Sequence, residues 1–89
     1  MHSWTKDDDI VAFYLEKYGE DALITLQLVS QKMRMTVGSL DMRVRNFKAL
    51  MGIGKLDHNA RLSKEVLNAM ESVGKDTHRE RCLKILSER

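Results

Sequence analysis

The spacing of hydrophobic residues along the chain predicts a series of helices. From Lys6 to Tyr18 a broad apolar stripe follows the helical repeat, and Thr5 with Asp8 has the spacing of a capping box. Gly19 is a predicted helix end. A second helix is expected over about 21–33, because apolar positions there recur every three or four residues. Its predicted inward positions are Ala22, Leu23, Leu26, Val29, Ser30 and Met33.

The third predicted helix carries the strongest periodic signal in the chain. A short turn over 34–36 precedes it, Thr36 is its predicted cap, and it extends to about Met51. Gly52-Ile53-Gly54-Lys55 then interrupts the pattern and is interpreted as a loop. The predicted inward positions, spaced alternately three and four residues apart, are Val37, Leu40, Val44, Phe47 and Met51.

Two further helices are expected after this loop. One covers about 63–73 and ends at Gly74, with inward positions at Val66, Leu67, Met70 and Val73. The spacing of Thr77 and Glu80 predicts a second capping box that opens the last helix. The inward positions of that helix are Cys82, Leu83, Ile85 and Leu86, which completes an all-α prediction.

Composition agrees with one helical domain, 1–89, in a soluble protein. The chain has 89 residues, 43% hydrophobic and 31% charged, with no proline. No apolar run approaches the ~20 residues of a membrane-spanning helix. The first residues lack the basic start and apolar stretch of a signal peptide. The single cysteine, Cys82, fits a reducing compartment, so we expect a cytoplasmic protein.

The net charge of +2 conceals an uneven distribution. Residues 1–30 hold two basic and six acidic side chains, whereas residues 31–55 hold six basic side chains and a single acidic one, Asp41. Residues 56–89 are nearly balanced, with seven basic and six acidic side chains. A basic middle third indicates a polar face directed at an anion, although a solvated helix surface would give the same pattern.

Several of these basic side chains lie on or beside the outward side of the third predicted helix. Arg43 and Lys48 flank its two edges. Small side chains permit close approach to a major groove, Asn46 could bind adenine through two hydrogen bonds, and Arg45 could bind guanine. The alternative is a solvent-exposed helix whose polar residues contact only water. The predicted outward residues are Met35, Gly38, Ser39, Met42, Arg45, Asn46 and Ala49.

Two segments resemble a known family. Trp4-Thr5-Lys6-Asp7-Asp8 resembles the start of Myb/SANT-like helix-turn-helix domains. The segment 36–47 resembles their recognition helix, and its Ser39…Arg43…Asn46-Phe47 pattern is similar to the prokaryotic and phage branch. The resemblance covers about 4–51 and implies a trihelical helix-turn-helix, followed by a two-helix extension over 62–89. Phe13 and Phe47 would take the space of the family's further core tryptophans.

The resemblance also implies a set of contacts with double-stranded DNA. Ser39, Arg43, Arg45, Asn46 and Lys48 would touch the DNA, with Lys32 and Arg34 near its backbone, and Met42 shares their outward face. The expected function is that of a small transcriptional regulator or DNA-binding accessory protein. The alternative is a protein-interaction module, such as a phage-type inhibitor or adaptor, that presents the same basic face to an acidic partner. Residues 62–89 are the candidate contact for a protein partner or homodimer.

The sequence gives little support for a metal site or for enzymatic activity. His2, His58 and His78 have no metal-ligand spacing, and each is expected at the surface. The run Asp7-Asp8-Asp9 is interpreted as the charged start of a helix rather than a metal site. No nucleophile, paired-carboxylate or nucleotide-loop pattern is present. We therefore expect no enzymatic activity, no metal and no cofactor.

Overall fold

Five helices make up the part of the chain that the structure describes. The structure, a computed structural model, describes residues 4–53 and 61–89, and side chains for 4–49 and 62–89. The helices are α1 (Lys6–Tyr18), α2 (Leu26–Met33), α3 (Val37–Ile53), α4 (Arg61–Met70) and α5 (Lys75–Ser87). The described ranges contain no strand, and no helix within them is long and apolar enough to cross a membrane. The all-α prediction is confirmed.

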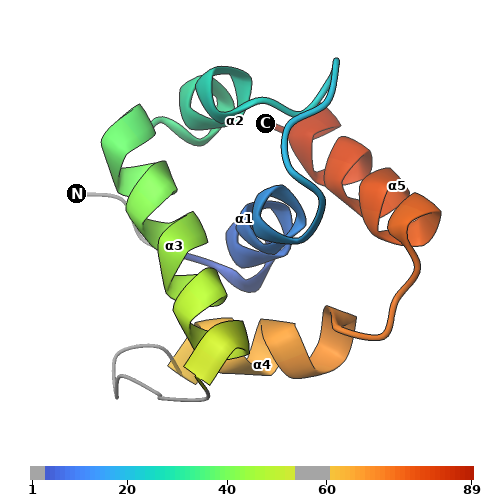
Figure 1. Ribbon diagram of the computed structural model, residues 1–89. Helices are drawn as coiled ribbons and strands as arrows, with labels where there is room; N and C mark the ends of the chain where they lie inside the picture. Colours follow the sequence, from blue (N-terminus) through green and yellow to red (C-terminus); the bar gives the residue numbers. More distant parts are fainter. Residues whose placement is uncertain (1–3, 54–60) are drawn as a thin grey trace.

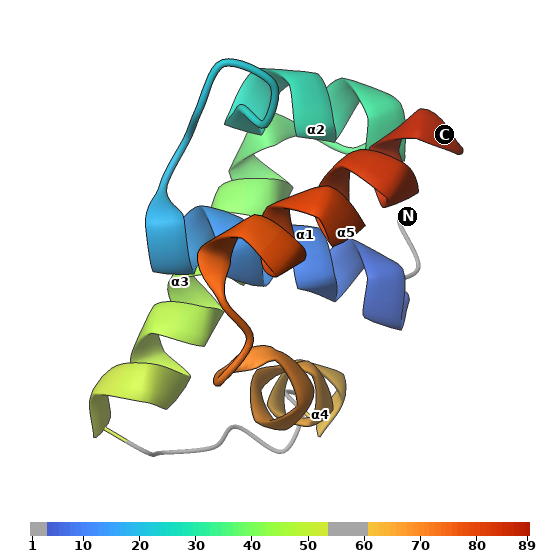
Figure 2. The same ribbon diagram turned by 90° about the vertical axis from the view of Figure 1, so that its right-hand side faces the viewer.

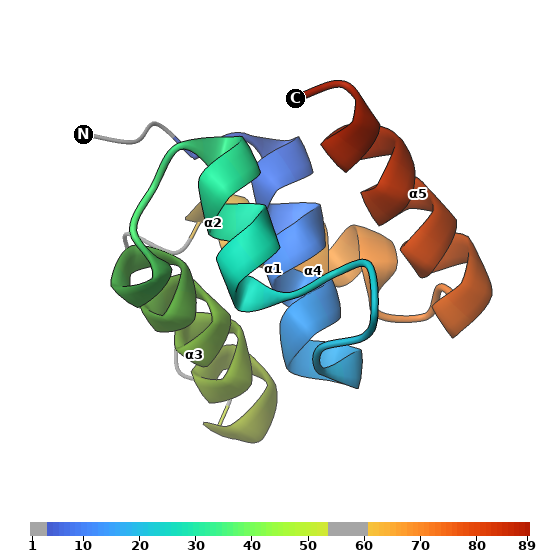
Figure 3. The same ribbon diagram turned by 90° about the horizontal axis from the view of Figure 1, so that it is seen from above.

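Helix α1 lies at the centre, and the other four helices surround it (Figure 1). Figure 2 shows α5 alongside α1 with α4 below it, and Figure 3 shows α3 and α5 on opposite sides of α1. Consistent with this position, every residue from Asp8 to Leu15 is buried, so α1 has no solvent-facing side over two turns. All five helices therefore share one core.

The predicted ends of α1 are confirmed. The Thr5 hydroxyl accepts the Asp8 N–H at 3.2 Å, and the Asp8 carboxylate accepts the Thr5 N–H at 3.2 Å. This capping box satisfies two of the backbone donors that a helix start leaves free. At the other end Gly19 adopts a positive φ of 77°, and its N–H donates to the Leu15 carbonyl at 2.9 Å.

Aromatic rings and one lysine join the helices around α1. The rings of Phe13 and Phe47 stack with centroids 5.1 Å apart, which connects α1 to α3. Lys17 Nζ donates to the carbonyls of Met70, Glu71 and Val73 at 3.3, 2.7 and 3.1 Å, where α4 ends. A cation at a helix C-terminus is favourable because the last carbonyls have no partner within the helix.

The prediction for the start of the second helix is wrong by five residues, because α2 begins at Leu26. The Asp21 carboxylate accepts the N–H groups of Leu23 and Ile24 at 2.9 and 3.1 Å, and Thr25 caps α2 through the N–H of Leu28. These side-chain acceptors replace helical carbonyls and hold 21–25 outside the helix. Ala22 and Leu23 are consequently exposed, and Ile24 takes the buried position.

The predictions around the later helix boundaries also need correction. Gly52 and Ile53 belong to α3 rather than to a loop, while Gly54 and Lys55 lie outside the described residues. Helix α4 ends at Met70, and Gly74 is the residue before α5 rather than the end of α4. Because α5 begins at Lys75, the predicted capping box of Thr77 and Glu80 falls inside the helix. The inward positions predicted for these two helices are buried or half-buried.

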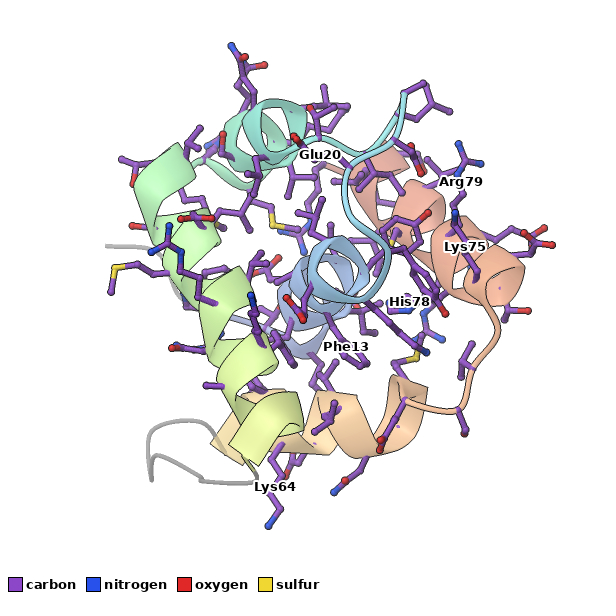
Figure 4. The ribbon with its side chains drawn as sticks, viewed as in Figure 1. Phe13, Glu20, Lys64, Lys75, His78 and Arg79 are labelled. Carbon is purple, nitrogen blue, oxygen red and sulfur yellow. The ribbon has the colours of Figure 1, made fainter. Side chains whose placement is uncertain are left out.

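His78 is buried, contrary to its expected surface position, whereas His2 and His58 lie outside the described residues. Its ring points from α5 towards α1 and Phe13 (Figure 4). Nε2 lies 2.8 Å from the Ile10 carbonyl, so Nε2–H is the donor, and Nδ1 is buried without a hydrogen-bond partner among the described side chains. Burial among aromatic rings lowers the pKa of His78.

Candidate nucleic-acid interface

The connection between α2 and α3 is three residues long and is held at both ends. Arg34 has left-handed backbone dihedrals (φ 57°, ψ 46°), and its N–H donates to the Gln31 carbonyl at 3.2 Å. A left-handed residue other than glycine costs about 1–2 kcal/mol, so its neighbours must hold it there. Thr36 caps α3 as predicted, because its Oγ1 accepts the Ser39 N–H at 3.1 Å. This turn sets the direction in which α3 leaves α2.

Helix α3 lies at one edge of the molecule with its inner side against α1 (Figures 1 and 3). Leu40 and Phe47 are fully buried on that inner side, as predicted. Two positions differ from the prediction: Val37 is 44% exposed rather than buried, and Met35 is half-buried against the core rather than outward. The exposed outer face of α3 consists of Gly38, Ser39, Met42, Arg45, Asn46 and Ala49.

Most residues predicted to contact DNA are exposed in the structure. Among the large hydrophobic side chains that the structure describes, Met42 is the most exposed, at 68%. The Ser39 hydroxyl already accepts a hydrogen bond from the Thr36 hydroxyl at 3.0 Å. The side-chain amide of Asn46 makes no hydrogen bond to the other described side chains, so it is available to bind a ligand. The exposed members of the predicted set are Lys32, Arg34, Ser39, Met42, Arg45, Asn46 and Lys48.

Arg43 is the exception, because its guanidinium is bound inside the protein. Its Nε and Nη2 donate to the two carboxylate oxygens of Asp9, each at 2.7 Å. The Ser63 hydroxyl of α4 donates to the same carboxylate at 3.3 Å, and the Trp4 ring lies 4.7 Å from the guanidinium carbon. The Arg43 side chain is 15% exposed and that of Asp9 is fully buried. This cluster fixes the rotation of α3 about its own axis relative to α1.

Two of the exposed cations on α3, Arg45 and Lys48, have acidic neighbours. Arg45 Nε lies 3.0 Å from an Asp41 carboxylate oxygen one turn earlier in the helix. Burial raises the pKa of Glu16 on α1, and the charge of Lys48 opposes that rise, which places Lys48 near α1. Lys32 and Arg34 are exposed at the end of α2, just before α3 begins. The outer face thus combines small residues, a free amide and cations at its margins.

Sequence reasoning missed the acidic partners of these arginines. Asp9 and Arg43 are 34 residues apart, and no local pattern connects them. Ser63, which adds a third helix to that cluster, is likewise distant in sequence. Asp41 was detectable, because residues four apart on a helix are neighbours and Asp41 precedes Arg45 by four.

A second surface feature lies on the other side of α1, where α4 and α5 are found. This surface contains three hollows with volumes of about 470, 330 and 370 Å³, and Arg81 borders all three. Val66, Met70 and Val73 provide its apolar lining. Its charged side chains carry both signs, namely Lys6, Asp7, Glu65, Glu80, Arg81, Lys84 and Glu88. Apart from the contribution of α1, this α4–α5 surface comes from the segment 62–89 that was expected to contact a protein partner.

No metal site is assembled in the described part of the chain, where no three His, Cys, Asp or Glu side chains gather around one point. Comparison with protein-family models, with curated proteins and with solved structures finds no match to this chain. The geometry of α3 and its neighbours is therefore the basis on which a function is inferred.

Proposed function

We propose that this chain binds double-stranded DNA by placing the outer face of α3 in the major groove. The observation that carries the proposal is the exposure of that face behind a short, capped turn, with cations at its margins. An α-helix with its side chains is about 10–12 Å across, and the major groove is about 12 Å wide. Gly38 and Ala49 keep the helix surface low enough for base edges to be reached.

The proposal includes the finer architecture implied by the resemblance to Myb/SANT-like domains. Helices α1–α3 would form the trihelical helix-turn-helix, and α4 and α5 the C-terminal extension. Support comes from the three-residue turn and from the stack of Phe13 on Phe47, which fills the space expected for further tryptophans. The chain would act as a small transcriptional regulator or accessory factor, and the proposal assigns it no catalytic step.

The eight predicted contact residues take three different roles, according to where the structure places them. Arg45, Asn46, Met42 and Ser39 occupy the face that would meet base edges. Lys32, Arg34 and Lys48 would neutralise phosphates at the margins. Arg43 acts through α3 rather than on DNA, because its bonds to Asp9 set which residues of α3 face outward.

The first test is a titration of the purified chain with a labelled random-sequence duplex at several salt concentrations, followed by fluorescence anisotropy. Three or four phosphate contacts predict a slope of log K against log salt of about −2.7 to −3.6. Affinity should then fall roughly 40- to 150-fold between 50 and 200 mM salt. Absence of binding at the lowest salt would refute the proposal.

Two substitutions on α3 separate base contacts from phosphate contacts. Lys48→Ala should weaken binding to all duplexes and reduce the salt slope by about one unit. Asn46→Ala should weaken binding to a selected preferred sequence while affecting a random duplex little. Lys75→Ala is the matched control, because Lys75 is an exposed lysine at the start of α5, across α1 from α3 (Figure 1). Equal effects of the two α3 substitutions on every duplex would exclude base contact by Asn46.

A second candidate function is protein binding through the same face. Met42 at 68% exposure and Val37 at 44% add apolar surface to the basic residues, a combination suited to an acidic protein partner. The α4–α5 surface offers a separate contact for a partner or a second copy. Failure to bind DNA together with binding of an acidic protein through Met42 and Arg45 would favour this alternative.

A further inference from the structure

Asp41 and Arg45 form an ion pair in the middle of the face assigned to DNA. The Arg45 side chain is 77% exposed and that of Asp41 37% exposed. Asp41 is also the single acidic residue among residues 31–55, which hold six basic ones. An acidic side chain beside a phosphate-lined groove repels DNA, so its presence there calls for a compensating role.

The ion pair with Asp41 involves the Nε atom of Arg45 and does not use all of the donors of its guanidinium. The Asp41 carboxylate lies on the Nε side of the guanidinium, at 3.0 Å. Within the described side chains, Arg45 has no second ion-pair partner, and a guanidinium has five N–H donors, so a carboxylate at Nε leaves N–H groups of the Nη atoms available for another contact. Guanine presents N7 and O6 in the major groove, and an arginine binds both by two parallel N–H groups.

The position of Arg45 on α3 suits this contact. Gly38, Met42, Arg45 and Ala49 follow one another at intervals of four, three and four residues, so they form one stripe on the outer face. Arg45 is the member of this stripe with several hydrogen-bond donors, and Gly38 and Ala49 leave room beside it. Arg43, two residues earlier, cannot do the same because Asp9 already binds its guanidinium inside the protein.

We propose that Arg45 is a specificity-determining residue that reads guanine, and that Asp41 is a positioning residue that holds its guanidinium for this contact. This inference rests on the proposed DNA-binding function. Asp41 restricts the rotamers of a long side chain before binding, which lowers the ordering cost of the contact. It therefore reduces affinity for DNA in general and increases discrimination in favour of a guanine-containing site.

The test begins with selection of preferred duplexes from a randomised pool by the wild-type chain. Dissociation constants are then measured for the selected duplex, for the same duplex with its guanine pair replaced by adenine–thymine, and for a random duplex. A bidentate arginine–guanine contact predicts about ten- to hundredfold discrimination between the first two. Arg45→Lys should keep affinity for the random duplex within about twofold and lose at least about tenfold of this discrimination, because lysine keeps the charge without the planar fork.

Asp41→Asn provides the sharper result, because two effects of opposite sign are expected. The variant should bind the random duplex about two- to fivefold more tightly, since a repulsive charge is lost. Its guanine discrimination should nevertheless fall about three- to tenfold. Asp76→Asn, which removes an exposed carboxylate from the first turn of α5, is the matched control and should change neither quantity.

The outcomes separate this inference from the function on which it rests. If Asp41→Asn strengthens binding to all duplexes equally, Asp41 has no positioning role. If Arg45→Lys retains discrimination, Arg45 does not read guanine. If the wild-type chain binds no DNA, the proposed function fails, and this inference fails with it. Circular dichroism of each variant establishes that the exposed substitutions leave the helices intact.

Discussion

Replacing Arg43 with methionine should destabilise the fold strongly, because it leaves the Asp9 carboxylate charged and buried. In the wild-type chain both carboxylate oxygens of Asp9 accept from Arg43 at 2.7 Å, and the Asp9 side chain is fully buried. After the substitution, the Ser63 hydroxyl at 3.3 Å is a weak remaining donor. Removing one partner of a buried ion pair costs about 3–5 kcal/mol.

That loss is large beside the total stability of such a domain, which is roughly 4–13 kcal/mol for this length. Urea denaturation followed by circular dichroism measures it, and the midpoint should fall by about 2 M or more. Trp4, the one tryptophan of the chain, lies 4.7 Å from the Arg43 guanidinium carbon, so its fluorescence reports on the same cluster. Both probes should give one transition if the chain unfolds in two states.

Two further variants distinguish the buried charge from a general effect of losing an arginine. Arg45→Met makes the same change two residues along α3, where the ion pair is exposed, and should cost at most about 0.5 kcal/mol. Asp9→Asn added to Arg43→Met removes the unpaired charge and should restore about half of the lost stability. A loss below about 1 kcal/mol for Arg43→Met, or no recovery in the double variant, would refute this reasoning.

Three other predictions concern the core. Because burial lowers the pKa of His78 below the unfolded value of about 6.5, the unfolded chain binds the proton more readily, and the free energy of unfolding should fall as pH decreases from 7.5 to 5.5. His78→Gln should flatten the pH dependence of the unfolding free energy measured by urea titration. If the wild-type chain and the variant show the same pH dependence, His78 is not its source. Lys17→Met should lower the free energy of unfolding by about 2 kcal/mol, because it removes a cation from three carbonyls. Lys64 is the control: its side chain points away from α4 (Figure 4), so Lys64→Met should leave the urea midpoint unchanged. Burial raises the pKa of Cys82 to about 12, so a thiol-reactive disulfide should label it in urea but not in the native protein at pH 8.

The ends of the helices show where sequence reasoning holds and where it does not. Thr5 with Asp8, Gly19 and Thr36 cap their helices as predicted, because each acts on backbone groups within a few residues. The second helix begins late because Asp21 takes local N–H groups and is held by partners from other elements. Its carboxylate also accepts from Tyr14 and Arg79 at 2.9 and 3.0 Å. The hydrogen bond from the Leu23 N–H, together with those from Arg79 and Tyr14, lowers the pKa of Asp21 to about 2.

The candidate interface was predictable to a similar extent. The helical period of α3 places Ser39, Met42, Arg45 and Asn46 on its outer face, and the structure leaves all four exposed. Periodicity places Arg43 at the edge of the apolar stripe and Arg45 on the outer face, but it could not show that the guanidinium of Arg43 is bound inside the protein while that of Arg45 is exposed. The difference arises because Asp9 on α1 lies within reach of one and not of the other.

The amino-acid sequence alone determined that this chain is helical, where most of its helices lie, and which side of α3 carries the polar residues. These properties depend on interactions between residues a few positions apart, and a helical repeat records them directly. Tertiary structure decided the burial of His78 and the pairing of Arg43 with Asp9. The contacts responsible, to the Ile10 carbonyl and to the Asp9 carboxylate, span 68 and 34 residues, and only packing around α1 brings them together.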